Sequence, residues 1–396
     1  MTTSGYWSNT SMAFYVILGL YTIWIIRMIK QSKVKRIYDG KSLPISYAII
    51  FVSVLTIVAA FRLVTYGIGG ADAITYKYFF EHCNNPIYQN NAWFLHQDVL
   101  FRYITKLLRL FTGDHHFYFF VMYGFMVVAY LLFMIEFCPK RSNYIPCLLL
   151  IFLYWRGFNT LRSNIAIAIM MIALILLYRK KTKMALGVAV SSFFVHKMAA
   201  IYLLFFPFYF LFTRIKLTKF RFVLVMLMVI FSGSLIQRFF LDYFADEELN
   251  GAYVSYATRS IHSSFWDNTW KIAFEQMSLG AMMWIYYRKI QRHILLLNKH
   301  DARRLQLVWM MCLFDVMTIP INYTMGVWRG YEFFYLPRII MWCEILYLFN
   351  ISRNKKERYS LNVLFLCAFI AWMVFRFYSM WESSCLMPYI FEPFVS

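Results

Sequence analysis

Charged residues are scarce in this 396-residue sequence, and their scarcity excludes an ordinary water-soluble fold. They make up 15% of the chain, whereas hydrophobic residues make up 61% and aromatic residues 21%. A soluble domain of this length does not need so much apolar volume to fill its core. The apolar runs between short basic turns predict a polytopic membrane protein instead. We therefore expect an all-α fold that forms one integral membrane domain over residues 1–396.

Acidic residues, cysteine motifs and repeats are also in short supply. The chain has 19 Asp and Glu against 40 Lys and Arg, for a net charge of +21. Its cations form short clusters and no continuous basic face, which argues against nucleic acid as a partner. The seven cysteines form no CxxC or CxxH pair, so we predict no metal site and no cofactor. The pattern also predicts no disulfide framework, with a Cys83–Cys385 pair as the alternative because both could face the outside. The chain shows no secretory signal and no fixed-period repeat.

The basic clusters give a self-consistent topology of about twelve spans under the positive-inside rule. The cluster that follows residues 12–29 places the end of the first span in the cytoplasm, so the N-terminus is expected outside. The last span, 361–378, leaves the C-terminus outside as well. Three long loops are then external, at 65–116, 241–268 and 322–337.

One region does not fit a simple span. The basic clusters at 179–183 and 213–221 both favour the cytoplasm, yet too few apolar residues separate them for two full crossings. We therefore predict two short or broken helices that meet near His196 and Lys197. Irregular backbone at membrane depth is tolerated where it lines a cavity or is buried in protein.

The first external loop contains two predicted helices. Asp72 follows a glycine-rich turn and begins one helix, with Tyr76 four residues later. Asp72 is either a helix cap or a carboxylate that positions or deprotonates a sugar hydroxyl. The second helix, within 93–111, is amphipathic, with a basic face that contacts either solvent and lipid headgroups or the phosphate of a bound lipid.

Polar groups gather at the predicted outer ends of several spans. Arg156 and Arg162 flank Asn159, and Asn164 follows at the start of a helix. Arginine binds phosphate through paired hydrogen bonds, and a helix N-terminus adds backbone donors. The alternative is that both arginines extend to lipid headgroups without a specific role.

Two further regions add candidates. His196 lies at the predicted break, as either a hydrogen-bonded structural residue or a proton acceptor. The third loop places Arg329, Glu332 and Arg338 among aromatic residues, which form either an interfacial belt or stacking surfaces for sugar rings.

These residues, in this order, resemble the EpsG and Wzy-type polysaccharide polymerases of bacterial cell envelopes. The resemblance covers most of the chain and depends on five short motifs: glycine-Asp72-x-x-x-Tyr76, the D-x-L-F element at Asp98 to Phe101, Arg162-x-x-Ile-Ala, Phe194-x-His196, and Arg338 opening a late span. Two positions depart from the family pattern. Asp98 stands where a glutamate is commoner, and Lys197 follows the histidine, so the resemblance assigns neither a firm role.

The resemblance implies a multi-pass glycosyltransferase at the outer face of the bacterial plasma (inner) membrane. It would join oligosaccharide units carried on undecaprenyl diphosphate into O-antigen, capsule or exopolysaccharide, with a flippase and a chain-length regulator as further partners. The activated donor arrives on the lipid, so no cofactor is expected. The catalytic candidates are Asp72, His196 and Arg162, and the substrate-binding candidates are Tyr76, Arg156, Asn164, Lys197, Arg329 and Arg338.

Three other functions use some of the same features. A ligase that moves a finished glycan would use the same phosphate-binding arginines. An acyltransferase would need a histidine-aspartate pair near an acyl thioester. A lipid-oligosaccharide flippase would need cations reachable from both faces of the membrane.

Overall fold

The structure, a computed structural model, describes residues 8–31, 45–89, 98–137, 154–214, 269–319, 332–351 and 385–392, with scattered positions between 363 and 378. The described part is helical, with only two isolated β-bridges, so the predicted all-α class is confirmed. The helices are α1 (Asn9–Gln31), α2 (Ile45–Ala60), α3 (Ala73–His82), α4 (Pro86–Gln89), α6 (Val99–Phe111), α7 (His115–Phe137), α9 (Leu161–Tyr178), α10 (Thr182–Val195), η1 (Lys197–Ala199), α11 (Ala200–Leu203), α12 (Phe205–Arg214), α15 (Thr269–Ile285), α16 (Tyr287–Leu296), α17 (Lys299–Met317) and α19 (Tyr335–Ile351).

Three of the described helices are long and apolar enough to cross a bilayer: Asn9–Ile29 within α1, α7 and α9. Shorter apolar helices, among them α2 and α10, accompany them. These features identify a membrane protein. The predicted count of about twelve spans is not confirmed, and the predicted loop 241–268 and residues 322–331 of the loop 322–337 lie outside the described residues.

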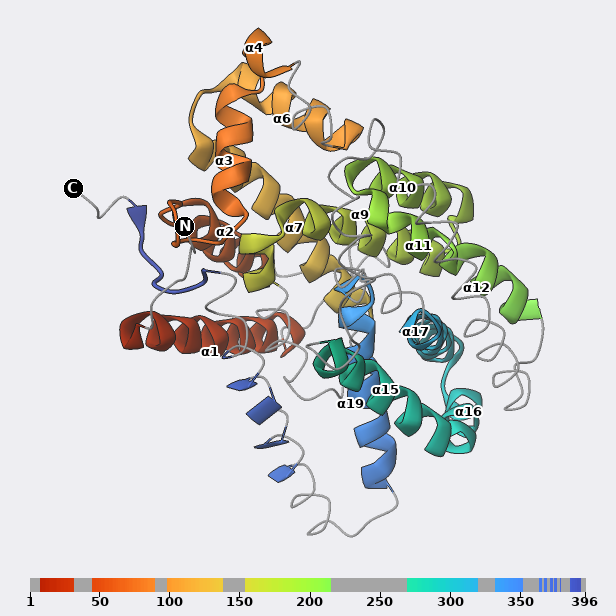
Figure 1. Cartoon of the computed structure of the whole chain (residues 1–396). Helices are drawn as coiled ribbons and strands as arrows, with labels where there is room; N and C mark the ends of the chain where they lie inside the picture. Colours follow the sequence, from red (N-terminus) through yellow and green to blue (C-terminus); the bar gives the residue numbers. More distant parts are fainter. Residues whose placement is uncertain are drawn as a thin grey trace.

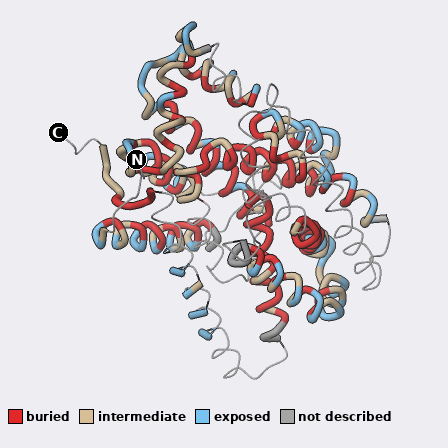
Figure 2. Tube along the Cα trace, in the orientation of Figure 1, coloured by how far each residue is buried: buried red, intermediate tan, exposed pale blue. Residues whose placement is uncertain are grey.

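Helix α9 lies at the centre of the bundle, with α7 and α10 packed along it (Figure 1). It is buried along almost its whole length, whereas α1 exposes one side (Figure 2). Small residues explain the close approach of α9 and α10, because Ala166, Ala173, Ala185 and Ala189 are all fully buried. Small side chains let helix backbones approach closely inside a membrane, where packing contributes much of the association energy.

The predicted break occurs at His196. Helix α10 ends at Val195, and His196 has extended backbone angles of φ −154° and ψ 114°. The short helices η1, α11 and α12 then continue the chain. The interrupted segment predicted from the basic clusters is therefore present.

A buried arginine, Arg62, fastens the end of α2 to the neighbouring elements. Its guanidinium donates to the carbonyls of Ala59, Gly69 (2.7 Å) and Phe158 (3.3 Å), and to the Tyr123 hydroxyl (2.8 Å). The Phe158 ring centroid lies 4.4 Å from it. Carbonyl dipoles and ring faces together compensate the buried charge.

The C-terminal segment returns to the end of α2. Leu63 donates to the Ile390 carbonyl and Glu392 donates to the Phe61 carbonyl, each at 2.8 Å. Cys83 and Cys385 are both buried, and neither takes part in a disulfide. Burial raises the pKa of the Cys83 thiol.

Candidate functional site

Four chain segments meet at the end of the bundle where α9 begins. They are the start of α6, the start of α9, the end of α10 with η1, and the segment that leads into α19. In the predicted topology this is the outer end. Most of the polar residues singled out from the sequence lie on these segments, and tertiary folding brings them close together.

Asp98 joins the two strongest candidates. Its Oδ2 atom lies 3.2 Å from Arg162 Nη1 and 3.6 Å from His196 Nδ1. The Asp98 side chain is 1% exposed, and that of His196 is 3% exposed. A separation of 3.6 Å is an electrostatic contact, longer than a hydrogen bond. Asp98, Arg162 and His196 therefore form one buried cluster, which we call the outer cluster.

A second pair has the same construction. Arg156 forms an ion pair with Glu332, the residue three positions before α19. In both pairs the arginine side chain is 16% exposed while the carboxylate is 1% exposed. In each pair the carboxylate is buried and the arginine side chain is the partly exposed member.

Asn159 connects the glycine-rich loop to the same region. Its Oδ1 accepts a hydrogen bond from the Asp72 backbone N–H at 2.7 Å. Gly70, with φ +113°, lies so close to this helical turn that an added Cβ would come within 2.3 Å of the Phe158 carbonyl oxygen. Only glycine allows that approach. Asp72 occupies the N-cap position of α3 without a side-chain capping bond, and it lies beside the segment that carries both arginines.

Two predicted substrate-binding residues, Asn164 and Tyr76, have side chains that contact other residues inside the protein. The Asn164 side chain accepts from Tyr130 Oη at 2.7 Å and donates to Thr160 Oγ1 at 2.9 Å. Tyr76 is 7% exposed and packs edge-on against Phe101, with ring centroids 5.8 Å apart. Both residues therefore support the outer cluster from within the protein.

The remaining predicted residues lie as follows. Lys197 is half-buried in η1, directly after His196. Arg338 is 3% exposed and lies on α19 near Glu332. Arg329 lies outside the described residues.

Arg338 belongs to a buried network of its own. Its Nε lies 2.8 Å from Asp315 Oδ2, and its Nη1 lies 3.6 Å from Glu275 Oε2. Gln276 donates to Asp315 Oδ1 at 2.8 Å. This network joins α15, α17 and α19, so it fixes the segment that carries Glu332.

The residues missed from the sequence are mainly the carboxylates. The sequence patterns assign no role to Asp98 or Glu332, and Asp315 lies within an apolar run. The available signal was the acid itself, because an ionisable residue within a membrane span is costly and usually has a partner. The partners could not be read from the sequence.

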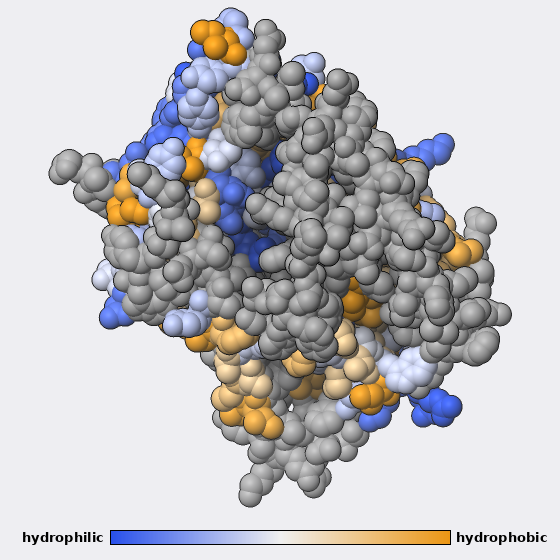
Figure 3. Space-filling view, viewed as in Figure 1, coloured by the Kyte–Doolittle hydropathy of each residue, from blue (hydrophilic) through white to orange (hydrophobic). Residues whose placement is uncertain are grey.

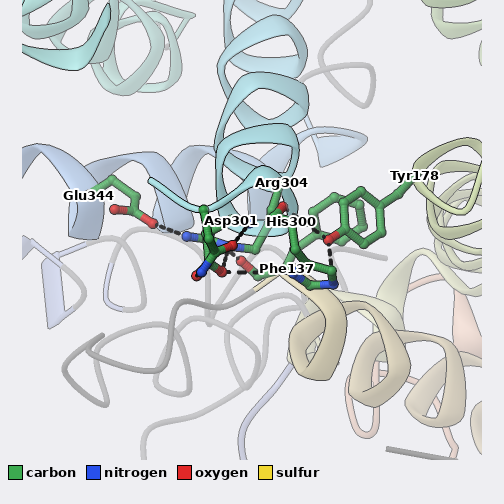
Figure 4. Close-up of polar contacts among 7 residues, drawn as sticks. Phe137, Tyr178, His300, Asp301, Arg304 and Glu344 are labelled. Carbon is green, nitrogen blue, oxygen red and sulfur yellow. Dashed lines mark hydrogen bonds and ion pairs between the residues drawn. The ribbon is translucent and has the colours of Figure 1, made fainter. Parts of the chain in front are cut away.

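A comparable set of ion pairs lies at the opposite end of α9 (Figure 4). Arg304 Nη2 lies 2.7 Å from Glu344, and Tyr178 Oη lies 2.8 Å from His300 Nε2. Arg179 pairs with Glu136 at 3.0 Å. The ends of α7, α9 and α17 predicted to be cytoplasmic therefore meet, and their ion pairs resemble those of the outer cluster but lie at the other end of the bundle. On the face shown in Figure 3, hydrophilic side chains gather in a recess above a more apolar region.

Comparison with known proteins gives one result. The family model described as the EpsG family matches residues 45–391. No curated protein and no solved structure gives a significant match. The matched range includes every described residue of the outer cluster and of the Arg338 network.

Proposed function

The chain belongs to the EpsG family, and we propose that it polymerises oligosaccharide units carried on undecaprenyl diphosphate into a surface polysaccharide. The family is associated with polysaccharide polymerase activity. The observation that supports this reaction best is the outer cluster, in which a buried carboxylate pairs with a partly exposed arginine side chain beside an imidazole.

The arginines serve the leaving group in this mechanism. When the bond between the sugar and the lipid diphosphate breaks, negative charge grows on the bridging oxygen. Arg162 and Arg156 stabilise that charge, and the N-terminus of α9 adds its positive dipole. Donors fixed before the reaction stabilise the transition state without reorganising, and Asp98 and Glu332 provide that fixation.

The acceptor hydroxyl attacks the same anomeric carbon and must lose its proton to a base. His196 is one candidate, because its imidazole lies in the outer cluster with Nδ1 3.6 Å from the Asp98 carboxylate. Asp72 is the other, because it is the more accessible carboxylate and lies beside the arginine segment. The polymer grows by one unit, and the lipid diphosphate leaves with its two phosphates.

Replacing Arg162 tests the proposal. In cells that carry Arg162→Ala as the sole copy, we expect the surface glycan ladder to disappear while single lipid-linked units accumulate. Arg179→Ala is the matched control, because it removes an ion-paired arginine from the other end of the same helix. Long polymer in the Arg162 variant, at normal protein level, would remove this residue from the mechanism.

An assay with purified protein distinguishes the two candidate bases. Asp72→Asn and His196→Gln each keep the size of the side chain and remove the proton acceptor. The variant that lacks the true base should lose most of its turnover at saturating substrate, and its remaining rate should lose the pH dependence of the wild-type enzyme.

A further inference from the structure

A group of potential metal ligands lies apart from the outer cluster, at the first turn of α7. Asp114, His115 and His116 offer ligand atoms that all lie within 4.8 Å of one another. Glu392 reaches the same point from the C-terminal segment. Its Oε2 atom lies 3.6 Å from His115 Nε2 and 3.4 Å from His116 Nε2.

The hydrogen bonding of His116 identifies the nitrogen that is available to a ligand. Its Nδ1 lies 3.0 Å from the Ala60 carbonyl oxygen, which only accepts, so the hydrogen is on Nδ1. The neutral ring then carries its lone pair on Nε2, directed at the Glu392 carboxylate. Phe61 stacks on the ring at 5.2 Å and fixes its plane. A metal-bound histidine usually has this arrangement, with its other nitrogen donating to a carbonyl or carboxylate.

Two buried atoms of the group make no hydrogen bond within the described structure. They are His115 Nε2 and Glu392 Oε2, and both face the centre of the group. Nitrogen and oxygen lone pairs that converge in this way repel one another unless a positive centre lies between them. A buried acceptor without a partner is costly, which makes it a pointer to an ion or a proton.

The separations fit a metal ion of zinc size. Zinc binds imidazole nitrogen at about 2.0–2.1 Å and carboxylate oxygen at about 2.0–2.2 Å. Two ligands at a tetrahedral angle are then roughly 3.4 Å apart, close to the measured 3.4 and 3.6 Å. Calcium and magnesium prefer oxygen ligands, so two imidazoles select against them.

We propose that His115, His116 and Glu392 bind a Zn²⁺ ion, with Asp114 as the fourth ligand. Glu81 Oε1 lies 3.9 Å from His115 Nδ1. It also lines a cavity of about 620 Å³ together with Lys77 and Tyr78. The ion would hold the C-terminal segment against the start of α7, and Glu81, facing the other nitrogen of His115, would connect the site to α3 and the wall of that cavity.

Metal binding by the purified full-length protein tests this proposal without reference to polymerisation. The protein is stripped with EDTA after removal of any affinity tag, in a Cys367→Ser background that removes the cysteine thiol exposed among the described residues. Titration with Co²⁺, a spectroscopic substitute for zinc, should give one equivalent with tetrahedral absorption bands that Zn²⁺ abolishes. His116→Gln and Glu392→Gln should each weaken binding at least tenfold.

His82→Gln is the matched control, because His82 lies on α3 and contacts Tyr78 and Tyr88 outside the group. It should bind Co²⁺ like the wild type. If a ligand variant does not fold, the stripped wild-type protein decides, since added Zn²⁺ should raise its Tm. The proposal is overturned by the absence of saturable binding, by equal affinity in the ligand variants, by preference for Mg²⁺ or Ca²⁺, or by an unchanged Tm.

Discussion

Replacing Asp98 by asparagine tests whether the ion pair that holds Arg162 in place contributes to catalysis, because Arg162 keeps its own positive charge in this variant. Asparagine keeps the shape of the side chain but removes the negative charge that lies 3.2 Å from Arg162 Nη1. At an effective dielectric constant of 20, that attraction is about 5 kcal/mol. An amide oxygen recovers about 1–2 kcal/mol of it through a hydrogen bond. About 3–4 kcal/mol of restraint on the guanidinium is then lost.

If that restraint acts on the transition state, turnover should fall about 10²- to 10³-fold, because each factor of ten corresponds to about 1.4 kcal/mol. Substrate affinity should move the other way. Asp98 competes with phosphate for the guanidinium, so its removal leaves more net positive charge for the lipid diphosphate. We therefore expect a lower kcat together with an unchanged or lower KM.

The assay is polymerisation by the purified protein with lipid-linked units as substrate, followed by separation of products by length. Glu136→Gln is the matched control, because it removes the carboxylate partner of Arg179 at the other end of α9. Normal turnover by Asp98→Asn at equal protein level would refute the reasoning. An equal loss of turnover in the Glu136 variant would show that breaking any ion pair along α9 lowers activity. That result would also contradict a specific role for Asp98.

The remaining predictions concern the buried network, the core and the topology. Arg338→Gln should reduce polymer length, whereas Arg304→Gln, which breaks an equally buried pair at the other end of the bundle, should lower the Tm and leave the residual polymer of normal length. Equal polymer patterns would contradict this. Arg62→Lys should destabilise the fold by about 3 kcal/mol, because one ammonium cannot reach all the acceptors of the guanidinium. An unchanged Tm would show that these acceptor atoms do not need a guanidinium donor. Ser263→Cys, with Cys367 replaced, should react with an impermeant thiol reagent added from outside, and protection would invert the predicted topology.

Much of the local structure follows from the sequence because it depends on neighbouring residues. The helix after Asp72 and the amphipathic helix α6 were both predicted, since periodicity and a glycine-rich turn act over a few residues. The break at His196 was predicted from charge alone, because two basic clusters that favour one side of a membrane limit what can lie between them.

The partners of the polar residues were decided by tertiary structure. Arg162 and His196 were identified as candidates, but Asp98 lies far from both in sequence and joins them only when α6 packs beside α10. The Glu392 carboxylate likewise reaches His115 and His116 only because the C-terminal segment pairs with the end of α2. A sequence fixes which side chains carry charge. Whether a charge binds substrate, holds another charge or surrounds an ion depends on which distant segment is packed against it, and long-range packing sets that.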